Sequence, residues 1–519
     1  MSTEKNPEDW QSIAKAKREA LFNSIPSEWR IPQEKLPSED QLDVTSFPKQ
    51  SGMLSEKELE ITSLPAQEIL RRLHDRTWTS EEVTTAFCKR AAIAHQLTNC
   101  LSETLFDSAI STARTLDQHL ERTGKPIGSL HGLPISLKDN FNIAGLDSTI
   151  GFASWVNAPA QKNSALVDLL TTAGAVLYVK TNVPTAMMIA ETVNNFRRRE
   201  RPHRFPRQPL GVGTDIGGSL RIPAACTGIF TLRPSFGRFP TGGAKSGLAG
   251  QEAVNSVNGP MARTLADLEL FGKAVVGAQP WRFDPKCVPV PWRSVEDAVG
   301  PKLNLGVMWD DGMVVPTPPV ARALREAVSK LRDAGHEIVE WPPTLHKEIA
   351  EVLGAFFVAD GGKSVEKIIK PVGEPWRPEM EAYAQARELG VHELWQLQGK
   401  RTQLMKDYLD RWTQAGIDGI ICPATPFATV EHGKFKHVAY TGVFNVLDYA
   451  ATSFPTGMHV DKALDKKADV KPLSDTDAQI QAEYNAEAVH GMPISLQLVA
   501  SRLEEEKVLA MTKIVLQAL

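Results

Sequence analysis

Cysteine is scarce in this sequence, and the cysteines that are present form no recognisable pattern. They include no CxxC pair and no cysteine–histidine cluster with the spacing of metal ligands, so no zinc-type site is evident. An odd number of scattered cysteines is also unsuited to a disulfide framework. We therefore expect buried, reduced thiols and no bound metal. The five cysteines are Cys88, Cys100, Cys226, Cys287 and Cys422.

The sequence also lacks a long apolar run and a strong excess of charge of one sign. No apolar stretch approaches the roughly 20 residues that a membrane-spanning helix needs. The start, MSTEKNPEDWQ, is polar and acidic where a secretory signal would be basic and then apolar. A formal net charge of −4 creates no global field that would capture nucleic acid or an anionic membrane. These absences predict a cytoplasmic protein with a small-molecule ligand and without a nucleic-acid or membrane partner.

No fixed-period repeat and no low-complexity linker divides the chain. Its 42% apolar and 23% charged residues are typical of soluble globular proteins. At 519 residues the chain exceeds the usual size of a single core, so length alone allows one large domain or two fused domains. Residues 1–60 are rich in Pro, Glu, Lys and Ser, as in an extended or partly helical arm. We predict that this arm packs on one large domain at residues 61–519.

Helical and strand-like patterns alternate along the body of the chain. Thr79 and Glu82 can form a capping box, and the apolar stripe that follows them has a helical period. Alternation of the two patterns predicts an α/β fold with a sheet covered by helices on both faces. The predicted helices begin near residues 79, 165, 320 and 504, and the predicted strands lie near 175–180, 303–308, 337–341 and 494–499.

The first segment that carries chemistry is HGLPISLKDNFNIAG, at residues 131–145. Residues 135–138 have the pattern of a strand, in which Ser136 and Lys138 share one face. A lysine at the end of a buried strand is costly to desolvate unless the amine has a function. The alternative is that Lys138 reaches solvent or pairs with Asp139, since lysine is rarely buried without a partner. The segment alone leaves both interpretations open.

The second segment is GVGTDIGGSLRIPAACTG, at residues 211–228. Its glycines allow successive N–H groups to converge on one point and to bind an anion. The anion would be a phosphate, or the oxyanion of an acyl transfer in which Ser219 is the nucleophile; a tight structural turn is the third interpretation. The segment matches neither the Walker motif nor the GxSxG elbow, and no histidine motif accompanies it. A lysine is therefore the candidate base. The candidate N–H donors are those of Ile216, Gly217, Gly218 and Ser219.

Together, HGLPISLKDN and GVGTDIGGSLRIPAA strongly resemble the amidase signature family of serine hydrolases. Further matching segments are GAVLYVKTNVP at 174–184, GPMARTLADLELF at 259–271 and YNAEAVHGMPISLQLVASRLEEE at 484–506. Within that family the sequence is most similar to the fungal acetamidase type of general amidase. The resemblance implies one large amidase-signature domain, in which helices flank a mixed central sheet on both faces.

The resemblance also implies a mechanism that needs neither metal nor cofactor. Members of the family hydrolyse carboxamides with a Ser-cisSer-Lys triad, in which Lys138 corresponds to the base and Ser219 to the nucleophile that forms the acyl-enzyme. Met187 corresponds to a residue that lines the acyl pocket, and its alternative role is to fill the core. The implied partner is a small-molecule amide, and a homodimer is compatible with the resemblance. The amides implied to form the oxyanion hole are those of Ile216, Gly217, Gly218 and Ser219.

The middle member of that triad is missing from the sequence. In the family a GGSSGG motif supplies the relay serine ahead of GVGTDIGGS. Here ETVNN at 191–195 is followed by FRRRERPHRFPRQ and then by PLGVGTDIGGS, and no serine occurs between Ser164 and Ser219. Three interpretations are open: a true loss of the motif, an error of gene prediction, or an arginine-rich localisation or RNA-contacting patch. The third is the least favoured, because the stretch stands where an active-site segment belongs.

Loss of the relay serine predicts reduced activity. Removing a proton-transfer group commonly lowers a rate by about 10² to 10⁴, and a water that bridges Lys138 and Ser219 would replace part of that loss. We expect weak amide hydrolysis that depends on Ser219. The alternative is a catalytically inactive relative with the same fold that binds a ligand or a partner.

Overall fold

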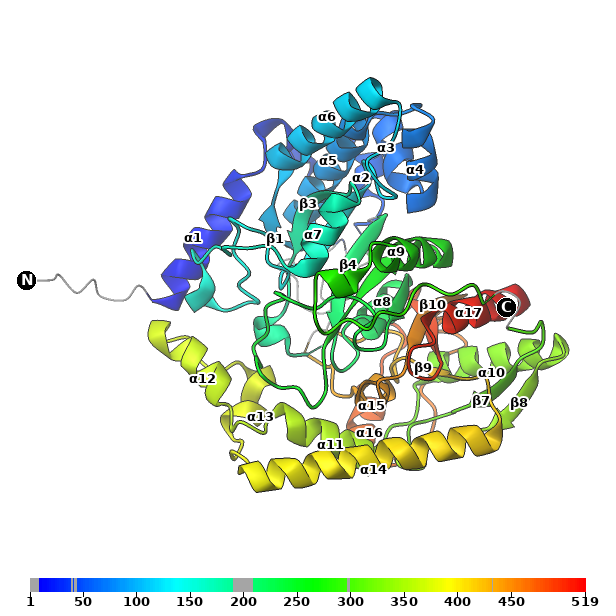
Figure 1. Cartoon of the computed structure of the whole chain (residues 1–519). Coiled ribbons are helices and arrows are strands. Elements are labelled where there is room, and N and C mark those ends of the chain that lie inside the picture. The colour runs from blue at the N-terminus through cyan, green and yellow to red at the C-terminus, as the bar shows by residue number, and fades with distance from the viewer. Residues whose placement is uncertain (1–8, 39–40, 42–43, 190–208, 296–298, 432) are drawn as a thin grey trace, which may run out of the picture.

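The computed structural model describes residues 9–38, 41, 44–189, 209–295, 299–431 and 433–519. Within these residues, eleven strands form one sheet in the order β1-β3-β2-β4-β6-β5-β10-β11-β9-β7-β8, and helices surround it (Figure 1). The strands are β1 (Leu101–Thr104), β2 (Pro134–Lys138), β3 (Val176–Thr181), β4 (Leu210–Asp215), β5 (Phe230–Arg233), β6 (Val257–Ala262), β7 (Asn304–Val307), β8 (Glu337–Glu340), β9 (Gly419–Pro423), β10 (Ala451–His459) and β11 (Pro493–Val499). The α-helices are α1 (Trp10–Asn23), α2 (Phe47–Gln50), α3 (Glu56–Ser63), α4 (Ala66–His74), α5 (Ser80–Thr98), α6 (Phe106–Thr123), α7 (Ala165–Thr172), α8 (Arg221–Thr227), α9 (Leu265–Gly277), α10 (Pro318–Asp333), α11 (His346–Phe357), α12 (Lys363–Ile369), α13 (Glu381–Ala384), α14 (Val391–Ala415), α15 (Ala439–Leu447), α16 (Asp475–Glu483) and α17 (Glu505–Ala518).

The sheet combines parallel and antiparallel pairs. β2 runs parallel to both β3 and β4, and β7 runs parallel to both β8 and β9. Between these two groups, β6, β5, β10 and β11 pair antiparallel with their neighbours. The predicted α/β fold with a mixed central sheet is therefore confirmed. Among the described helices, none combines the length and the apolar character needed to cross a bilayer.

The predicted capping box begins α5. Thr79 Oγ1 accepts a hydrogen bond from Glu82 N, and Glu82 Oε2 accepts one from Thr79 N, both at 3.1 Å. The helix then buries Phe87 in the same apolar core as Ile135 and Leu137 of β2, which are 0% exposed. β2 is thus held rigidly up to its last residue, where the first chemistry-bearing segment leaves the sheet.

The N-terminal arm packs on the β1 edge of the body (Figure 1). Lys17 of α1 forms an ion pair with Asp147 at 2.9 Å. Further along, the Trp29 ring packs edge-on against Phe106, with 5.5 Å between the ring centroids. The domain boundary at residue 60 stays a prediction.

β2 and β4 bring the two chemistry-bearing segments together. Their register pairs Leu137 with Val212, so Lys138 at the end of β2 lies beside the last residues of β4. Asp215 ends β4, and a turn leads from it into α8. Both segments therefore leave the sheet at the carboxyl ends of these two parallel strands, where their side chains can act together.

Candidate active site

Lys138 ends β2 with its amine hydrogen bonded to β4. Its Nζ donates to Thr214 Oγ1 at 2.8 Å. Burial lowers the pKa of the Lys138 amine to about 8, although the carboxylates of Asp215 and Asp139 oppose that shift. Asp139 accepts from Ile150 N at 2.6 Å, and among the described residues no ion pair joins it to Lys138. The structure therefore does not support a simple Lys138–Asp139 ion pair.

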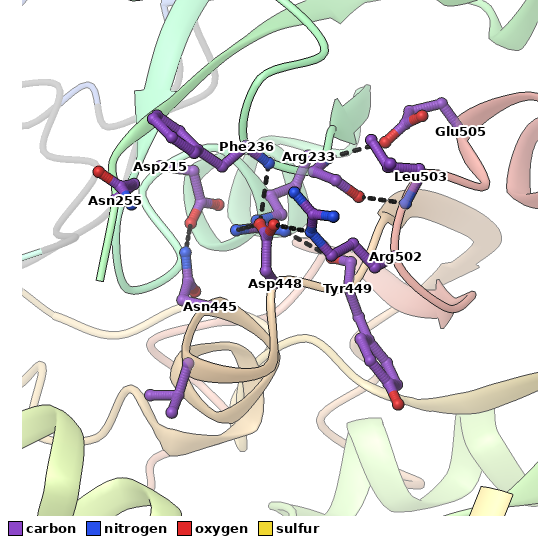
Figure 2. Close-up of polar contacts among 12 residues, drawn as sticks. Asp215, Arg233, Phe236, Asn255, Asn445, Asp448, Tyr449, Arg502, Leu503 and Glu505 are labelled. Carbon is purple, nitrogen blue, oxygen red and sulfur yellow. Dashed lines mark hydrogen bonds and ion pairs between the residues drawn. The ribbon is translucent and has the colours of Figure 1, made fainter. Parts of the chain in front are cut away.

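Asp215 is the centre of a buried polar cluster behind the glycine-rich turn. Its Oδ1 accepts from Asn445 Nδ2 at 2.8 Å (Figure 2), and the guanidinium of Arg221 donates to both carboxylate oxygens at 3.2 Å. Burial alone would raise the pKa of Asp215, but the positive charges of Arg221 and Arg233 hold it well below its usual range. Asp215 is therefore an ionised acceptor that can orient several donors at once.

This carboxylate fixes the turn that follows β4. Gly218 N donates to Asp215 Oδ1 at 2.8 Å, and Leu220 N donates to Asp215 Oδ2 at 3.1 Å. The φ angle of Gly218 is +130°, a conformation that favours glycine. One of the four predicted amide donors thus already has a protein acceptor. Within the described residues, the N–H groups of Gly217 and Ser219 have none and remain available to a ligand.

Ser219 lies half-buried at the end of the turn, directly before Leu220 and α8. The Phe357 ring approaches the turn, with its Cζ atom 3.6 Å from where a Cβ on Gly217 would lie. Ile216 packs in the same apolar cluster as Phe357. In the described part of the chain, Lys138 donates to Thr214 and forms no hydrogen bond with Ser219. The turn therefore has a polar side fixed by Asp215 and an apolar side.

Met187 ends a short 3-10 helix, η4 (Thr185–Met187). Ala186 and Met187 both have φ angles of +58°, which is uncommon for residues other than glycine. The half-buried Met187 side chain packs against an apolar cluster that includes Ile150 and Phe152. This packing agrees with the core-filling alternative, and the acyl-pocket role stays a prediction.

The missing relay serine and the arginine-rich stretch fall on residues 190–208, which lie outside the described residues. Ser136, which shares a strand with Lys138, is 1% exposed. Among the described residues, no group of three or more His, Cys, Asp or Glu side chains is placed to hold a metal ion. At this end of β2 and β4 the structure brings together Lys138, the glycine-rich turn and their hydrogen-bond partners.

The sequence reasoning missed two contributors to the site. Thr214 precedes Asp215 in the quoted motif, and a strand assignment for 210–215 would have placed it at the end of the strand beside Lys138. Asn445 lies 230 positions from Asp215, and no local pattern connects the two. Such a long-range polar contact is visible only in the folded chain.

Comparison with known proteins gives a consistent set of relatives. The family described as Amidase matches residues 82–201 and 207–509. An acetamidase from Emericella nidulans is 40% identical, and one from Aspergillus oryzae is 37% identical; each match covers 98% of both chains. Among solved structures, a fatty acid amide hydrolase superposes with a TM-score of 0.91 at 31% identity, covering 98% of this chain and 95% of that chain. Sequence and fold thus agree on one group of proteins.

Proposed function

The chain belongs to the amidase family, and we propose that it hydrolyses a small carboxamide to a carboxylate and ammonia through an acyl-enzyme on Ser219. As a family member, the chain is a hydrolase of amide carbon–nitrogen bonds. The relatives named acetamidase favour a small aliphatic amide as its substrate, with a small aromatic amide as the alternative.

The observation that carries this proposal is the buried amine of Lys138 beside an oriented turn. With a pKa lowered to about 8, a useful fraction of the amine is neutral near neutral pH and can accept a proton. A lysine with the ordinary pKa of 10.5 would be almost completely protonated under the same conditions. Lys138 is therefore the base that takes the proton from Ser219 Oγ as this oxygen attacks the amide carbon.

The turn stabilises the charge that this attack creates. The carbonyl oxygen becomes negative, and the N–H groups of Ile216, Gly217 and Ser219 donate to it; the Gly218 N–H instead holds the turn against Asp215. As the carbon–nitrogen bond breaks, Lys138 returns the proton to the leaving nitrogen, and ammonia departs. Water then attacks the ester on Ser219, with Lys138 again as base, and the carboxylate is released.

The proton path between Ser219 and Lys138 limits the rate in this proposal. No serine occurs between Ser164 and Ser219 to act as a relay. A bridging water carries the proton instead, and we expect a rate about 10² to 10⁴ below that of a complete triad. The proposed enzyme has three further features. Met187 lines the part of the active site that binds the acyl group of the substrate. The enzyme acts in the cytoplasm, and its expected assembly is a homodimer.

The decisive experiment measures ammonia release from a panel of small amides that includes acetamide. We expect weak release by the wild-type chain and none above background in Ser219→Ala or Lys138→Ala variants. Retention of full activity in Ser219→Ala would rule the mechanism out. Covalent labelling by a fluorophosphonate probe provides an independent test of the nucleophile at Ser219.

The same experiment separates the enzyme from an inactive relative. A folded wild-type chain that releases no ammonia and takes up no probe would be a binding protein with an amidase fold. The absence of a relay serine between Ser164 and Ser219 is the one observation that favours this second candidate.

A further inference from the structure

We propose that Thr441 and Asn445 of α15 are positioning residues that hold the oxyanion turn in its working geometry. The inference rests on the proposed function, because it concerns the same turn. Thr441 lies 224 positions from Gly217, and Asn445 lies 230 positions from Asp215. Neither belongs to the two segments that identified the site.

One stripe of α15 faces the turn. Thr441 and Asn445 are four residues apart, which places them on one side of the helix, and Asp448 follows the helix as its C-cap. Figure 2 shows Asn445 extending from this helix toward Asp215, and Asp448 beside Phe236 and Arg233. The helix therefore presents two polar side chains to the segment that carries Asp215 and Ser219.

Thr441 contacts the turn directly. Its Oγ1 lies 2.7 Å from Gly217 O and 3.0 Å from Val438 O, and a hydroxyl has only one hydrogen to donate. The shorter contact is the one to Gly217. Because a peptide unit is planar and trans, the Gly217 carbonyl and the Gly218 N–H point in opposite directions. Thr441 therefore holds one end of the peptide unit whose other end donates to Asp215.

Asn445 holds the opposite end of the same peptide unit through Asp215. Its Nδ2 donates to Asp215 Oδ1 at 2.8 Å, and its Oδ1 accepts from Arg221 Nη2 at 2.6 Å. An amide can make both contacts because it has a donor and an acceptor, whereas a carboxylate or an alkyl group cannot. Asn445 therefore links the carboxylate to the guanidinium and fixes the carboxylate that Gly218 N depends on.

The helix itself is firmly anchored. At its C-terminal end the Asp448 carboxylate accepts from Arg233 Nη2 at 3.1 Å, from Phe236 N at 2.8 Å and from Arg502 Nε at 2.7 Å (Figure 2). The approach to the turn is also close, because a Cβ on Gly218 would lie 2.1 Å from Thr441 Oγ1. α15 can thus act as a rigid support for the turn.

The catalytic consequence concerns the two amides on either side of the clamped unit. With the Gly217–Gly218 peptide fixed at both ends, the N–H groups of Gly217 and Ser219 are held in fixed directions for the oxyanion. Without the Thr441 hydroxyl this peptide unit can rotate, and the neighbouring amides turn with it. Misplacing such groups by about 1 Å can cost on the order of 10²-fold in rate.

Three variants test this role. Thr441→Val keeps the shape but removes the hydroxyl, Thr441→Ser keeps the hydroxyl, and Thr231→Val is the matched control. Thr231 is 0% exposed, and its hydroxyl donates to Pro260 O at 2.7 Å, so its loss removes a comparable buried hydrogen bond between β5 and β6, beside β4 but outside the turn. The measurements are kcat and KM for the best amide substrate, and hydrogen exchange of the peptide that spans residues 210–222.

We expect Thr441→Val to lower kcat by about 10- to 100-fold while KM changes by less than about threefold. Exchange of the 210–222 peptide should become faster. Thr441→Ser should restore both properties, and Thr231→Val should change neither, although it lowers the stability of the fold.

The exchange measurement decides the inference even if the wild-type chain hydrolyses no amide. Absence of wild-type activity overturns the proposed function, whereas exchange at 210–222 that is equal in Thr441→Val and Thr231→Val overturns the positioning role. An equal decrease of kcat in Thr441→Val and Thr441→Ser would also overturn the positioning role, because side-chain packing rather than the hydroxyl would then be responsible for the decrease.

Discussion

The protein environment of a single amine sets the pH range in which the proposed chemistry can run. Lys138 must be neutral to accept the proton of Ser219, and burial lowers its pKa to about 8. We therefore expect kcat/KM for an uncharged amide to rise with pH, to inflect near pH 8 and to level off above it. A profile measured from pH 6 to 10 checks this expectation. A profile that still rises at pH 10, as expected for a base with the ordinary lysine pKa of 10.5, would contradict the lowered pKa of this amine.

Variants of Thr214 provide the control for that profile. The Thr214 hydroxyl accepts a hydrogen bond from Lys138 Nζ, and such a contact is stronger when the amine is charged. Thr214→Val removes the acceptor, destabilises the protonated amine and should move the inflection below pH 8. Thr214→Ser keeps the acceptor and should leave the inflection in place.

Sequence patterns identify some residues of the site better than others. A strand pattern and a glycine-rich turn made Lys138 and Ser219 candidates, and the resemblance to the amidase signature family implied their roles as base and nucleophile. Thr441 and Asn445 were not predicted, because their relation to the turn exists only through tertiary contacts. Hydrogen bonds between distant segments leave no periodic signal in the sequence, so the residues that hold the turn could be identified only from the structure.

At the scale of elements, a helix with a solvent-exposed face was easier to predict from the sequence than a helix that is buried on all sides. α5 was predicted from its capping box and its apolar stripe, and the structure confirms both. α15 was not predicted, because every residue from Ala439 to Leu447 is buried and the helix has no solvent-exposed face. A helix that is enclosed on all sides has lost the amphipathic period on which sequence reasoning depends.

Contact between α15 and the turn makes two neighbouring glycines respond differently to alanine. At Gly218 the φ angle is +130° and a Cβ would lie 2.1 Å from Thr441 Oγ1, so Gly218→Ala should destabilise the fold by about 1–3 kcal/mol. At Gly217 a Cβ would meet only Phe357, at an ordinary 3.6 Å, so Gly217→Ala should cost much less. Urea unfolding of both variants checks the difference. Equal losses in the free energy of unfolding would mean that α15 does not pack closely against the turn.

At the scale of the whole molecule, the N-terminal arm reaches the charged groups beneath the site. Lys17 of α1 pairs with Glu103 and, at 2.9 Å, with Asp147. Lys180 donates to the Asp147 carbonyl oxygen and lies 3.6 Å from Asp139, the neighbour of Lys138. A series of polar contacts thus connects the arm to Asp139, and the arm should contribute to the stability of the body rather than merely cover it.

Removing the charge of Lys17 tests this connection. Lys17→Met leaves the carboxylates of Glu103 and Asp147 without their shared cation, and we expect a loss of about 1–3 kcal/mol in urea unfolding at pH 7.5. Lys15→Met on the same helix is the matched control, since the Lys15–Glu19 pair is exposed and 3.9 Å apart, and should change stability by no more than about 0.5 kcal/mol. The pH dependence of the stability loss in Lys17→Met adds a second check. Burial raises the pKa of Glu103, so its charge, and with it the part of the penalty that Glu103 contributes when Lys17 is lost, disappears as the pH falls through that raised value. The stability gap between Lys17→Met and wild type should therefore narrow at pH 5, and a gap that stays constant or widens would show that these carboxylates are not what Lys17 stabilises.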